Sequence, residues 1–406
     1  MSLANLAERA RARDAADPLA GFRERFVVRD TSLIYLDGNS LGRLPKATEA
    51  RLQRLIADEW GGELVRGWTH WLGEPERVGE IIGRQILGAR PGETIVSDST
   101  TVNLYKLAHA ALDARPNRRV IVAARDEFPT DRYVLEGLAA ARDLEIRWLD
   151  GNHIDGPTGA DLRAVLDEDV ALVVLSLVNY RSGSIADLRG VTAATHAVGA
   201  LILWDLSHAG GAIPIELEEG GADLAVGCTY KYLNGGPGAP AYLYVRRSLQ
   251  DALRTPIQGW FGQHEQFAMG PRYDPAPGIR AWLAGTPGVL ALAAVEEGVR
   301  LTAEAGLPAI RAKGIALTEF AIELFDERLA PLGCTLGSPR PAADRGAHVA
   351  IGHPLARRLC EELIARGVVA DFREPDTIRF GLPPLSTSFA DVAGGVGALV
   401  GLLGGR

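Results

Sequence analysis

Cysteine is scarce in this sequence, which has 406 residues and only Cys228, Cys334 and Cys360. No two of them form a CxxC pair, so we expect neither a zinc site nor a disulfide framework, and we predict no bound metal. A positive net charge is also lacking, since the formal net charge is -8. Without a basic field to gather phosphates, broad binding to nucleic acid or to an anionic membrane surface is excluded.

Long hydrophobic runs are absent as well. The longest nearly apolar stretch, LAGTPGVLALAAV at 283–295, is interrupted by Gly-Thr-Pro-Gly and is too short to span a bilayer. The N-terminal stretch MSLANLAERARARDAADPLA has no continuous apolar core and carries early acids, which predicts an amphipathic helix and not a signal peptide. We therefore expect a cytoplasmic protein.

What is present is an alternation of helical and strand-like patterns. The length suggests two or three domains, and the composition, with 47% hydrophobic and 23% charged residues, is ordinary for a globular protein. The patterns predict helices at 76–89, 101–114, 132–143 and 191–200, and strands at 118–124, 144–150, 171–178, 200–207 and 222–228. The last three strands are short continuous apolar runs, which are typical of a parallel sheet covered by helices on both faces. The fold class is therefore α/β, with a mainly parallel central sheet.

From about residue 300 the pattern changes to that of a smaller α/β domain. It predicts helices at 307–329 and 356–367, a strand at 348–354 and a hairpin-like pair of strands at 368–385. We divide the chain into an N-terminal segment (1–45) that contributes to the small domain or a dimer, a large domain (46–300) and a small C-terminal domain (301–406). Pro287 and Gly288 mark a possible hinge.

Polar residues follow the predicted buried strands, at the sheet edge where ligands of α/β proteins gather. Asp205 lies inside an apolar strand, and a buried carboxylate needs a partner, which is either a structural one or a cationic ligand. His208 alone is more often structural than catalytic. Lys231 alone is typically a surface residue, but apolar GCTY precedes it and glycine-rich LNGGPGAP follows it. A desolvated lysine near another cation loses its proton readily and forms Schiff bases.

Two further features complete the pattern. SDSTTVN at 97–103 places hydroxyls and free N–H groups at a helix start, which is either an anion site or a plain N-cap. Phe128 follows another strand and offers a ring for stacking. A lysine, an aspartate, an anion site and an aromatic ring are together the parts of a pyridoxal 5'-phosphate site.

At this point the chain resembles the kynureninase family, which has the aspartate-aminotransferase-like fold type I, from about residue 20 to 390. The resemblance rests on the joint order of several motifs: YLDGNSLGRLP (35–45), RGWTHW (66–71), STTVNLYKL (99–107), EFPTDRY (127–133), LVNYRSG (177–183), WDLSHAGGAIPIEL (204–217), GCTYKYLNGGPGAPAYLYV (227–245), QGWFGQ (258–263) and GTP (285–287). It implies pyridoxal phosphate as cofactor and a homodimer. It also implies the hydrolysis of L-kynurenine, or 3-hydroxy-L-kynurenine, to anthranilate, or its hydroxylated analogue, and L-alanine. The implied context is tryptophan catabolism or NAD biosynthesis.

The resemblance also implies residue roles. Lys231 would carry the cofactor as a Schiff base, Asp205 would pair with the ring N–H, His208 would lie near the 3-oxygen, and Tyr230 would touch the phosphate and act as an acid–base group. The other implied cofactor residues are Thr100, Thr101, Phe128, Pro129, Thr130 and Asp131, with Trp260 and Thr286 supplied by the partner subunit. Arg379 would hold the substrate carboxylate, which guanidinium geometry suits, and Trp68 is a further candidate for the substrate pocket.

Other functions stay open at this stage. A cysteine desulfurase or class V aminotransferase has the same fold, but desulfurases tend to have histidine where Tyr230 stands, and they need a mobile reactive cysteine. Cys334 and Cys360 have no obvious activating neighbour in the sequence. A non-catalytic binding protein on this fold would have lost Lys231 or Asp205, and both are present. The composition gives no support to a structural scaffold.

Overall fold

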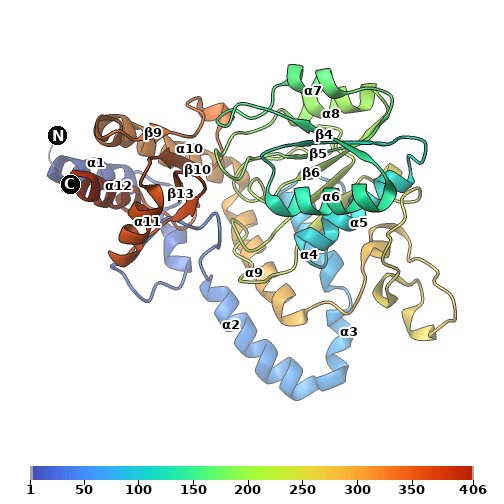
Figure 1. The fold of residues 1–406 in the computed structure, drawn as a ribbon. Coiled ribbons are helices and arrows are strands. Elements are labelled where there is room, and N and C mark those ends of the chain that lie inside the picture. Colours follow the sequence, from blue (N-terminus) through green and yellow to red (C-terminus); the bar gives the residue numbers. More distant parts are fainter. Residues whose placement is uncertain (1–2, 405–406) are drawn as a thin grey trace.

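A larger and a smaller α/β part lie side by side in the computed structural model, which describes residues 3–404 (Figure 1). The larger part holds a sheet in the order β2-β8-β7-β6-β5-β3-β4. Its strands are β2 (Thr94–Val96), β3 (Val120–Ala124), β4 (Glu145–Leu149), β5 (Val170–Ser176), β6 (Leu201–Asp205), β7 (Leu224–Gly227) and β8 (Tyr242–Val245). The five strands from β7 to β4 run parallel, while β8 is antiparallel to both β7 and β2. The predicted mainly parallel sheet is therefore confirmed.

Helices cover both faces of this sheet. They are α4 (Glu74–Gln85), α5 (Thr100–Asp113), α6 (Pro129–Arg142), α7 (Gly159–Val165), α8 (Leu188–Ala197) and α9 (Val289–Ala305), whereas α2 (Lys46–Arg54) and α3 (Trp68–Trp71) lie in the segment that extends away from the sheet. Helices α5 and α6 lie on one face, and α7 and α8 lie on the other (Figure 1). The helix predicted at 76–89 ends earlier, at Gln85, and the chain then turns through Gly88, whose positive φ of 60° ends the helical conformation.

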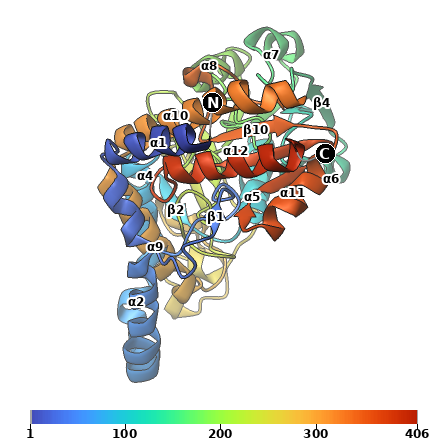
Figure 2. The same cartoon turned by 90° about the vertical axis from the view of Figure 1, so that its left-hand side faces the viewer.

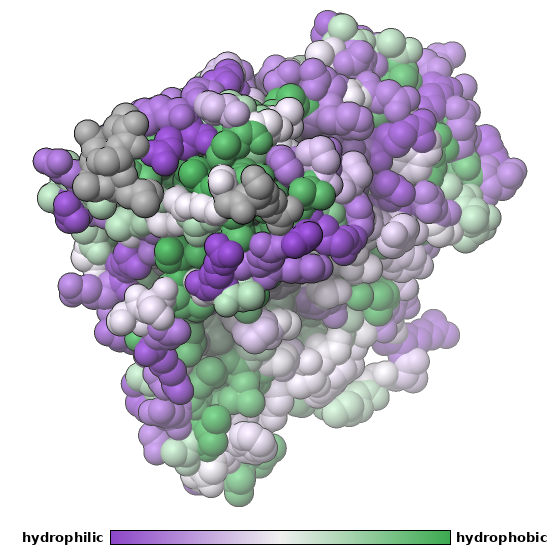
Figure 3. Space-filling model, turned by 60° about the vertical axis from the view of Figure 1, so that its left-hand side comes forward, coloured by the Kyte–Doolittle hydropathy of each residue, from purple (hydrophilic) through white to green (hydrophobic). Residues whose placement is uncertain are grey.

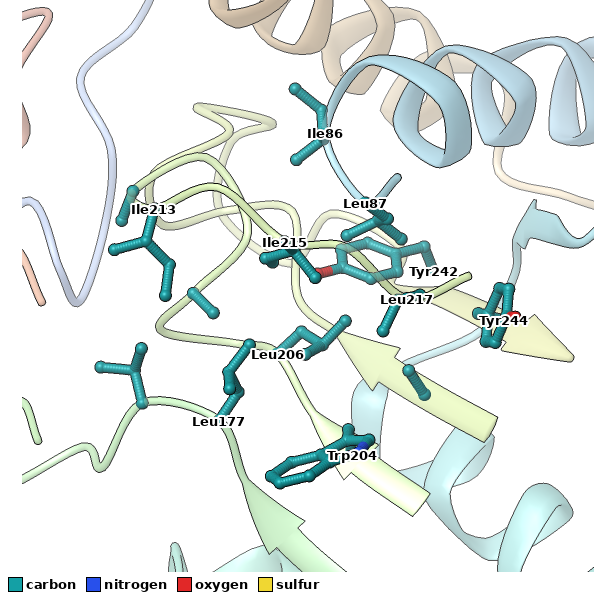
Figure 4. Packing of buried hydrophobic residues seen from close by; sticks show 14 of the residues in the cluster. Ile86, Leu87, Leu177, Trp204, Leu206, Ile213, Ile215, Leu217, Tyr242 and Tyr244 are labelled. Carbon is teal, nitrogen blue, oxygen red and sulfur yellow. The ribbon is translucent and has the colours of Figure 1, made fainter. Parts of the chain in front are cut away.

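The sheet separates two apolar layers because alternate strand residues point to opposite faces. On β6, Ile202 and Trp204 belong to one layer, whereas Leu201 and Leu203 belong to the other. Figure 4 shows part of the first layer, in which Trp204 and Leu206 lie below side chains of the 213–217 segment and Tyr242. Burial on both faces explains the continuous apolar runs in the sequence. The carboxyl ends of these strands lie at one edge of the sheet because the strands are parallel.

The smaller part is built on an antiparallel sheet. Its strands, in sheet order, are β12 (Asp371–Arg373), β13 (Thr377–Gly381), β10 (His348–Gly352) and β9 (Thr335–Leu336). Around them pack α10 (Leu307–Leu324), α11 (Ala356–Ala365), α12 (Phe389–Gly404) and α1 (Leu3–Ala15). The pair predicted at 368–385 is confirmed as the β12–β13 ladder.

The N-terminal segment belongs spatially to the smaller part. Figure 2 shows α1 beside α12, and β1 (Ile34–Tyr35) pairs in parallel with β11 (Val368–Val369). The boundary drawn between residues 300 and 301 falls inside α9, so the division of the chain into domains stays a prediction.

Helix α2 and the π-helical stretch that follows it, Leu55–Glu63, form an arm that projects from the body (Figures 1 and 2). Trp60, Leu64 and Val65 are exposed on this arm. Figure 3 shows apolar side chains gathered on the lower part of the molecule, where the arm projects. Among residues 3–404, no helix has the length and apolar character needed to cross a membrane.

Candidate active site

The carboxyl ends of β5, β6 and β7 and the start of α5 surround a cavity of about 180 Å³. Most of the residues predicted from the resemblance line it: Thr100, Thr101, Phe128, Thr130, Asp131, Asp205, His208, Tyr230 and Lys231. Residues far apart in the sequence meet here because parallel strands end at one edge of the sheet.

Lys231 is buried, with 8% of its side chain exposed. Its Nζ lies 3.0 Å from His208 Nε2, and it also faces the rings of Phe128 at 5.7 Å and Tyr230 at 5.9 Å. The backbone turns sharply after Lys231 because Asn234, Gly236 and Gly238 in the following loop all have positive φ. Lys231 is therefore an interior amine beside an aromatic ring and not a surface charge.

Two carboxyl groups share one end of the cavity. Asp205, at the end of β6, accepts a hydrogen bond from Ser207 N at 2.7 Å. Asp131 is 1% exposed, and its carboxyl oxygens have no hydrogen-bond donor in the described chain, while the neighbouring carboxyl of Asp205 acts on the pKa of Asp131 as a hydrogen-bond partner. Burial, followed by the charge of Asp205, raises the pKa of Asp131 well above its ordinary value. The pair therefore carries about one negative charge and suits a ligand with one cationic ring nitrogen.

The other end of the cavity is the N-terminus of α5. Ser99 caps this helix by accepting from Val102 N at 3.3 Å, so the first-turn N–H groups of Thr100 and Thr101 are left to a ligand. The nearby carboxylate of Asp98 is neutralised by buried Lys106, whose Nζ lies 2.7 Å away. The N-cap interpretation of SDSTTVN is confirmed, and the anion site, which would use different atoms, stays a prediction.

Glu127 is a buried carboxyl at the site to which the sequence assigned no role. It accepts hydrogen bonds from Ser176 N at 2.8 Å and from Ser176 Oγ, and Ser176 is the β5 residue that pairs with Asp205 in the sheet. Burial raises the pKa of Glu127 to about 8. Its only sequence signal is its place in the EFPTDRY motif, directly before Phe128.

Replacement of Glu127 by glutamine is expected to flatten the pH dependence of stability. The folded protein keeps the Glu127 proton up to about pH 8, whereas the unfolded chain releases it near the ordinary glutamate pKa. Stability is therefore lost as pH rises between those values, on the order of a few kcal/mol. Thermal melting of the cofactor-free protein from pH 5 to pH 8.5 measures this, with Glu136→Gln, exposed on α6, as control. An unchanged slope in Glu127→Gln contradicts the assignment.

Arg379 lies outside the cavity lining but next to it. Its side chain is 1% exposed, with Nε donating to Asp371 Oδ1 at 2.8 Å and Nη2 donating to Asp371 Oδ2. Its Nη1 donates to the carbonyl of Tyr180, which lines the cavity, and Nη2 lies 3.3 Å from Ser40 Oγ. The neighbouring Asn39 is fully buried, and both of its side-chain polar atoms lack partners in the described chain.

The remaining predicted residues are not among those that line the cavity, although Pro129 stands between two that do, Phe128 and Thr130. Pro129 starts α6. Trp260 is 43% exposed and Thr286 is exposed. Trp68 packs on Trp71 with ring centres 5.5 Å apart, and both Trp68 and Trp260 contact Phe261, so they belong to one aromatic cluster.

The residues present fit pyridoxal phosphate. An amine, a stacking ring, a carboxyl pair with unpartnered oxygens and a helix N-terminus face one cavity, which matches the aldehyde, the ring, the ring nitrogen and the phosphate of that cofactor. Among residues 3–404, no group of three or more His, Cys, Asp or Glu side chains is placed to hold a metal ion.

Comparisons with known proteins agree with this geometry. The family model described as "Kynureninase C-terminal domain" matches residues 310–399, and the model "Aminotransferase class-V" matches residues 80–354. A kynureninase of Pseudomonas fluorescens is 45% identical over 385 residues, covering 93% of this chain and 91% of its own length. A kynureninase of Burkholderia pseudomallei (strain 1106a) is 44% identical over 393 residues, covering 95% and 92%.

Solved structures with the same fold are more distant in sequence. A cysteine desulfurase from Thermococcus onnurineus NA1 matches with a TM-score of 0.79 at 18% identity, covering 98% of both chains. A C-DES variant with glycine covalently linked to its PLP cofactor matches with a TM-score of 0.80 at 16% identity, covering 91% of this chain and 97% of its own. These likenesses confirm the fold class, which is that of PLP-dependent class V aminotransferases.

Proposed function

The chain belongs to the kynureninase family, and we propose that it hydrolyses L-kynurenine to anthranilate and L-alanine with pyridoxal phosphate as cofactor. The observation that carries the proposal is the position of the Lys231 amine, which shares one cavity with the Asp131–Asp205 pair and the start of α5. Kynurenine and water have the same atoms as anthranilate and alanine, so the reaction needs no further reactant.

The cofactor, when bound, supplies an electron-withdrawing ring that stabilises negative charge on the carbon next to the substrate amine. We assign Lys231 the covalent hold on the cofactor aldehyde and the transfer of the α-proton. Asp205, with Asp131, keeps the ring nitrogen protonated. Phe128 holds the ring plane, and the start of α5 holds the phosphate.

Tyr230 is the group we assign to the ketone of the substrate. Tyr230 lines the cavity, and burial raises the pKa of its hydroxyl, which therefore remains a proton donor at neutral pH. Water adds to the ketone carbon with Tyr230 as acid–base partner, and the bond between Cβ and Cγ then breaks. Anthranilate leaves with the added oxygen, and Cβ of the alanine fragment takes up a proton.

The choice between kynurenine and 3-hydroxykynurenine is tested by turnover of both. We propose that kynurenine is a substrate and that its hydroxylated form is also accepted. Purified protein is incubated with each compound, and anthranilate or 3-hydroxyanthranilate is measured to obtain two values of kcat/KM. Formation of neither product contradicts the proposed function.

A cysteine desulfurase is the alternative on this fold, and the cysteines oppose it. Cys228, Cys334 and Cys360 are all buried. Burial raises the pKa of Cys334 and of Cys360 to about 11 and also raises that of Cys228, so none is a ready thiolate. Sulfide release from cysteine, with no anthranilate from kynurenine, reverses this ranking.

Replacement of Arg379 by lysine is expected to raise KM for kynurenine by about 10- to 100-fold, with a smaller fall in kcat. A lysine keeps the charge but loses the two-pronged contact to a carboxylate. Steady-state kinetics measure the two constants. Arg373→Lys is the matched control, since Arg373 also binds Asp371, at 2.6 Å, and has no assigned substrate contact. Equal effects in both variants contradict a substrate role for Arg379.

We also propose a homodimer in which Trp260 and Thr286 complete the phosphate site of the partner. Both residues are exposed and neither lines the cavity of its own chain, which supports a role in the site of the partner. Lys231→Ala and Trp260→Ala/Thr286→Ala chains are each expected to be nearly inactive. After they are mixed, unfolded and refolded together, hybrids regain one intact site, giving about one quarter of wild-type activity. No recovery means that these residues serve their own chain.

The cellular location of the enzyme and the pathway that it serves are also proposals. The bacterial kynureninases among its relatives support a cytoplasmic enzyme of tryptophan catabolism or NAD biosynthesis.

A further inference from the structure

One buried histidine of the smaller part lies against the active site and has no role in the reaction described above. His348 begins β10, where the antiparallel register places it opposite Gly381 and places Ala350 opposite Arg379. Alternation along the strands therefore puts His348 and Arg379 on the same face of the sheet. The His348 side chain is 0% exposed, and neither ring nitrogen makes a hydrogen bond of ordinary geometry in the described chain, although the Arg181 backbone lies close enough to act on the pKa of the ring as a hydrogen-bond partner.

The neighbour of His348 is the histidine that contacts the cofactor lysine. The ring centres of His348 and His208 are 5.6 Å apart, with the planes inclined at 63°. His208 Nε2 lies 3.0 Å from Lys231 Nζ, while His208 Nδ1 is buried and also without a partner in the described chain. When Lys231 is an ammonium, which only donates, the facing Nε2 accepts and the His208 ring proton sits on Nδ1. That leaves a buried N–H donor on the side away from Lys231.

We propose that His348 is a positioning residue of the active site, a neutral imidazole that accepts the Nδ1–H of His208 and keeps the Nε2 lone pair of His208 turned toward Lys231. The structure shows no direct hydrogen bond between the two rings, so at a ring separation of 5.6 Å we place one bridging water between them, which holds nearly as well as a direct bond. The bond that one ring nitrogen makes sets the tautomer at the other.

The charges around the two rings favour neutral forms. Burial and the Arg379 charge lower the pKa of His348 to about 3. The Asp371 charge and a hydrogen bond with the Arg181 backbone oppose this shift, and the Lys231 charge adds to it. Burial and the Lys231 charge, with smaller contributions from Arg379, His348 and Arg373, hold the pKa of His208 well below its usual range. A carboxylate in the place of His348 would favour a charged His208 because of its negative charge. The neutral imidazole of His348 leaves the charge of His208 unchanged.

The competing partner for His208 is the hydroxyl of Tyr232. This hydroxyl is buried and unpartnered in the described chain, and the Tyr232 ring lies 6.5 Å from that of His208. The charges that act on it are those of Arg379, Asp37 and Asp371, which places the hydroxyl on the side of the smaller part. Tyr232→Phe is therefore a matched control that removes a polar atom from the same region.

The test is the tautomer of His208 in the cofactor-free protein. The chain has eight histidines, and after ¹⁵N-histidine labelling, long-range ¹H–¹⁵N correlation spectra distinguish the two tautomers, with His208→Gln assigning the signal. We expect neutral His208 with its proton on Nδ1 from pH 6 to pH 9, in wild type, in Tyr232→Phe and in His348→Gln, whose amide oxygen also accepts. In His348→Leu we expect a mixture of tautomers.

A second measurement connects the tautomer to Lys231. The rate constant for capture of pyridoxal phosphate by the cofactor-free protein, followed by absorbance, is expected to fall about tenfold in His348→Leu and to stay near wild type in His348→Gln. An unchanged tautomer in folded His348→Leu, or a shift in Tyr232→Phe, overturns the proposal. A proton on Nε2 of wild-type His208 overturns it even if His348→Leu does not fold. This inference rests on the proposed role of Lys231. The tautomer of His208 is measured without enzyme turnover, so a failure of this inference can be distinguished from a failure of the proposed function.

Discussion

Lys231→Ala protein is expected to purify without covalently bound cofactor and to lose turnover by at least about 10³-fold. The variant removes the amine that we assign to the aldehyde and to the α-proton, and positioned proton transfer alone contributes 10²- to 10⁴-fold. Among the described residues no other lysine lines the cavity, so no second amine stands ready to replace that of Lys231.

Two measurements check this prediction. Absorbance spectra with added pyridoxal phosphate follow the Schiff base, and anthranilate formation follows turnover. Lys46→Ala, exposed at the start of α2, is the control and should match wild type in both. A Lys231→Ala protein with a wild-type spectrum and wild-type turnover contradicts the assignment of this cavity as the cofactor site.

Asp205→Asn is expected to lower kcat by roughly 10²- to 10⁴-fold, because removal of one partner from a buried ion pair costs about 3–5 kcal/mol. The amide cannot neutralise a protonated ring nitrogen. The charge of Asp205 also helps to raise the pKa of Asp131, so Asp131 ionises more easily in the variant and compensates in part. The double variant Asp131→Asn/Asp205→Asn is therefore expected to be slower than either single variant.

Kinetics and the cofactor spectrum distinguish this effect from a loss of stability. Asp223→Asn is the matched control, because Asp223 is also a buried carboxylate, bonded to Ile202 N at 3.0 Å just before β7. It lies outside the cavity lining. The control should lower the melting temperature without changing the spectrum. Loss of kcat in Asp223→Asn equal to that in Asp205→Asn contradicts the assigned role.

The central parallel strands and the residues that follow them were predictable from local pattern alone. Strands β5, β6 and β7 are apolar because both of their faces are covered, and Asp205 stands out there as a polar residue. The direction of β8 was not predictable, since YLYV has the same pattern in a parallel or an antiparallel strand.

Helix α12 was not predicted because its sequence, FADVAGGVGALVGLLG, is rich in glycine, which disfavours helices. In the folded chain this helix packs in the core of the smaller part, where Val392, Val396 and Leu399 are buried, and this packing outweighs the local cost. Tertiary contacts decide such segments, and they are not visible in the local sequence.

The site residues that follow strands of the large sheet were predictable from local sequence pattern, whereas those contributed by the smaller part were not. Arg379 had a role only through the resemblance and His348 had none, because they meet the cavity region through a strand register and contacts between distant segments, which no spacing in the sequence specifies. Trp260 and Thr286 had roles only through the resemblance, and these roles stay predictions.

The most direct test of the proposed function is the product balance from L-kynurenine labelled with ¹³C at Cβ. Holoenzyme is incubated with this substrate, and the products are identified by NMR and mass spectrometry. We predict anthranilate and L-alanine in equal amounts, with the label in the alanine methyl group. A product that keeps the label joined to the aromatic ketone, or no conversion at all, contradicts carbon–carbon hydrolysis.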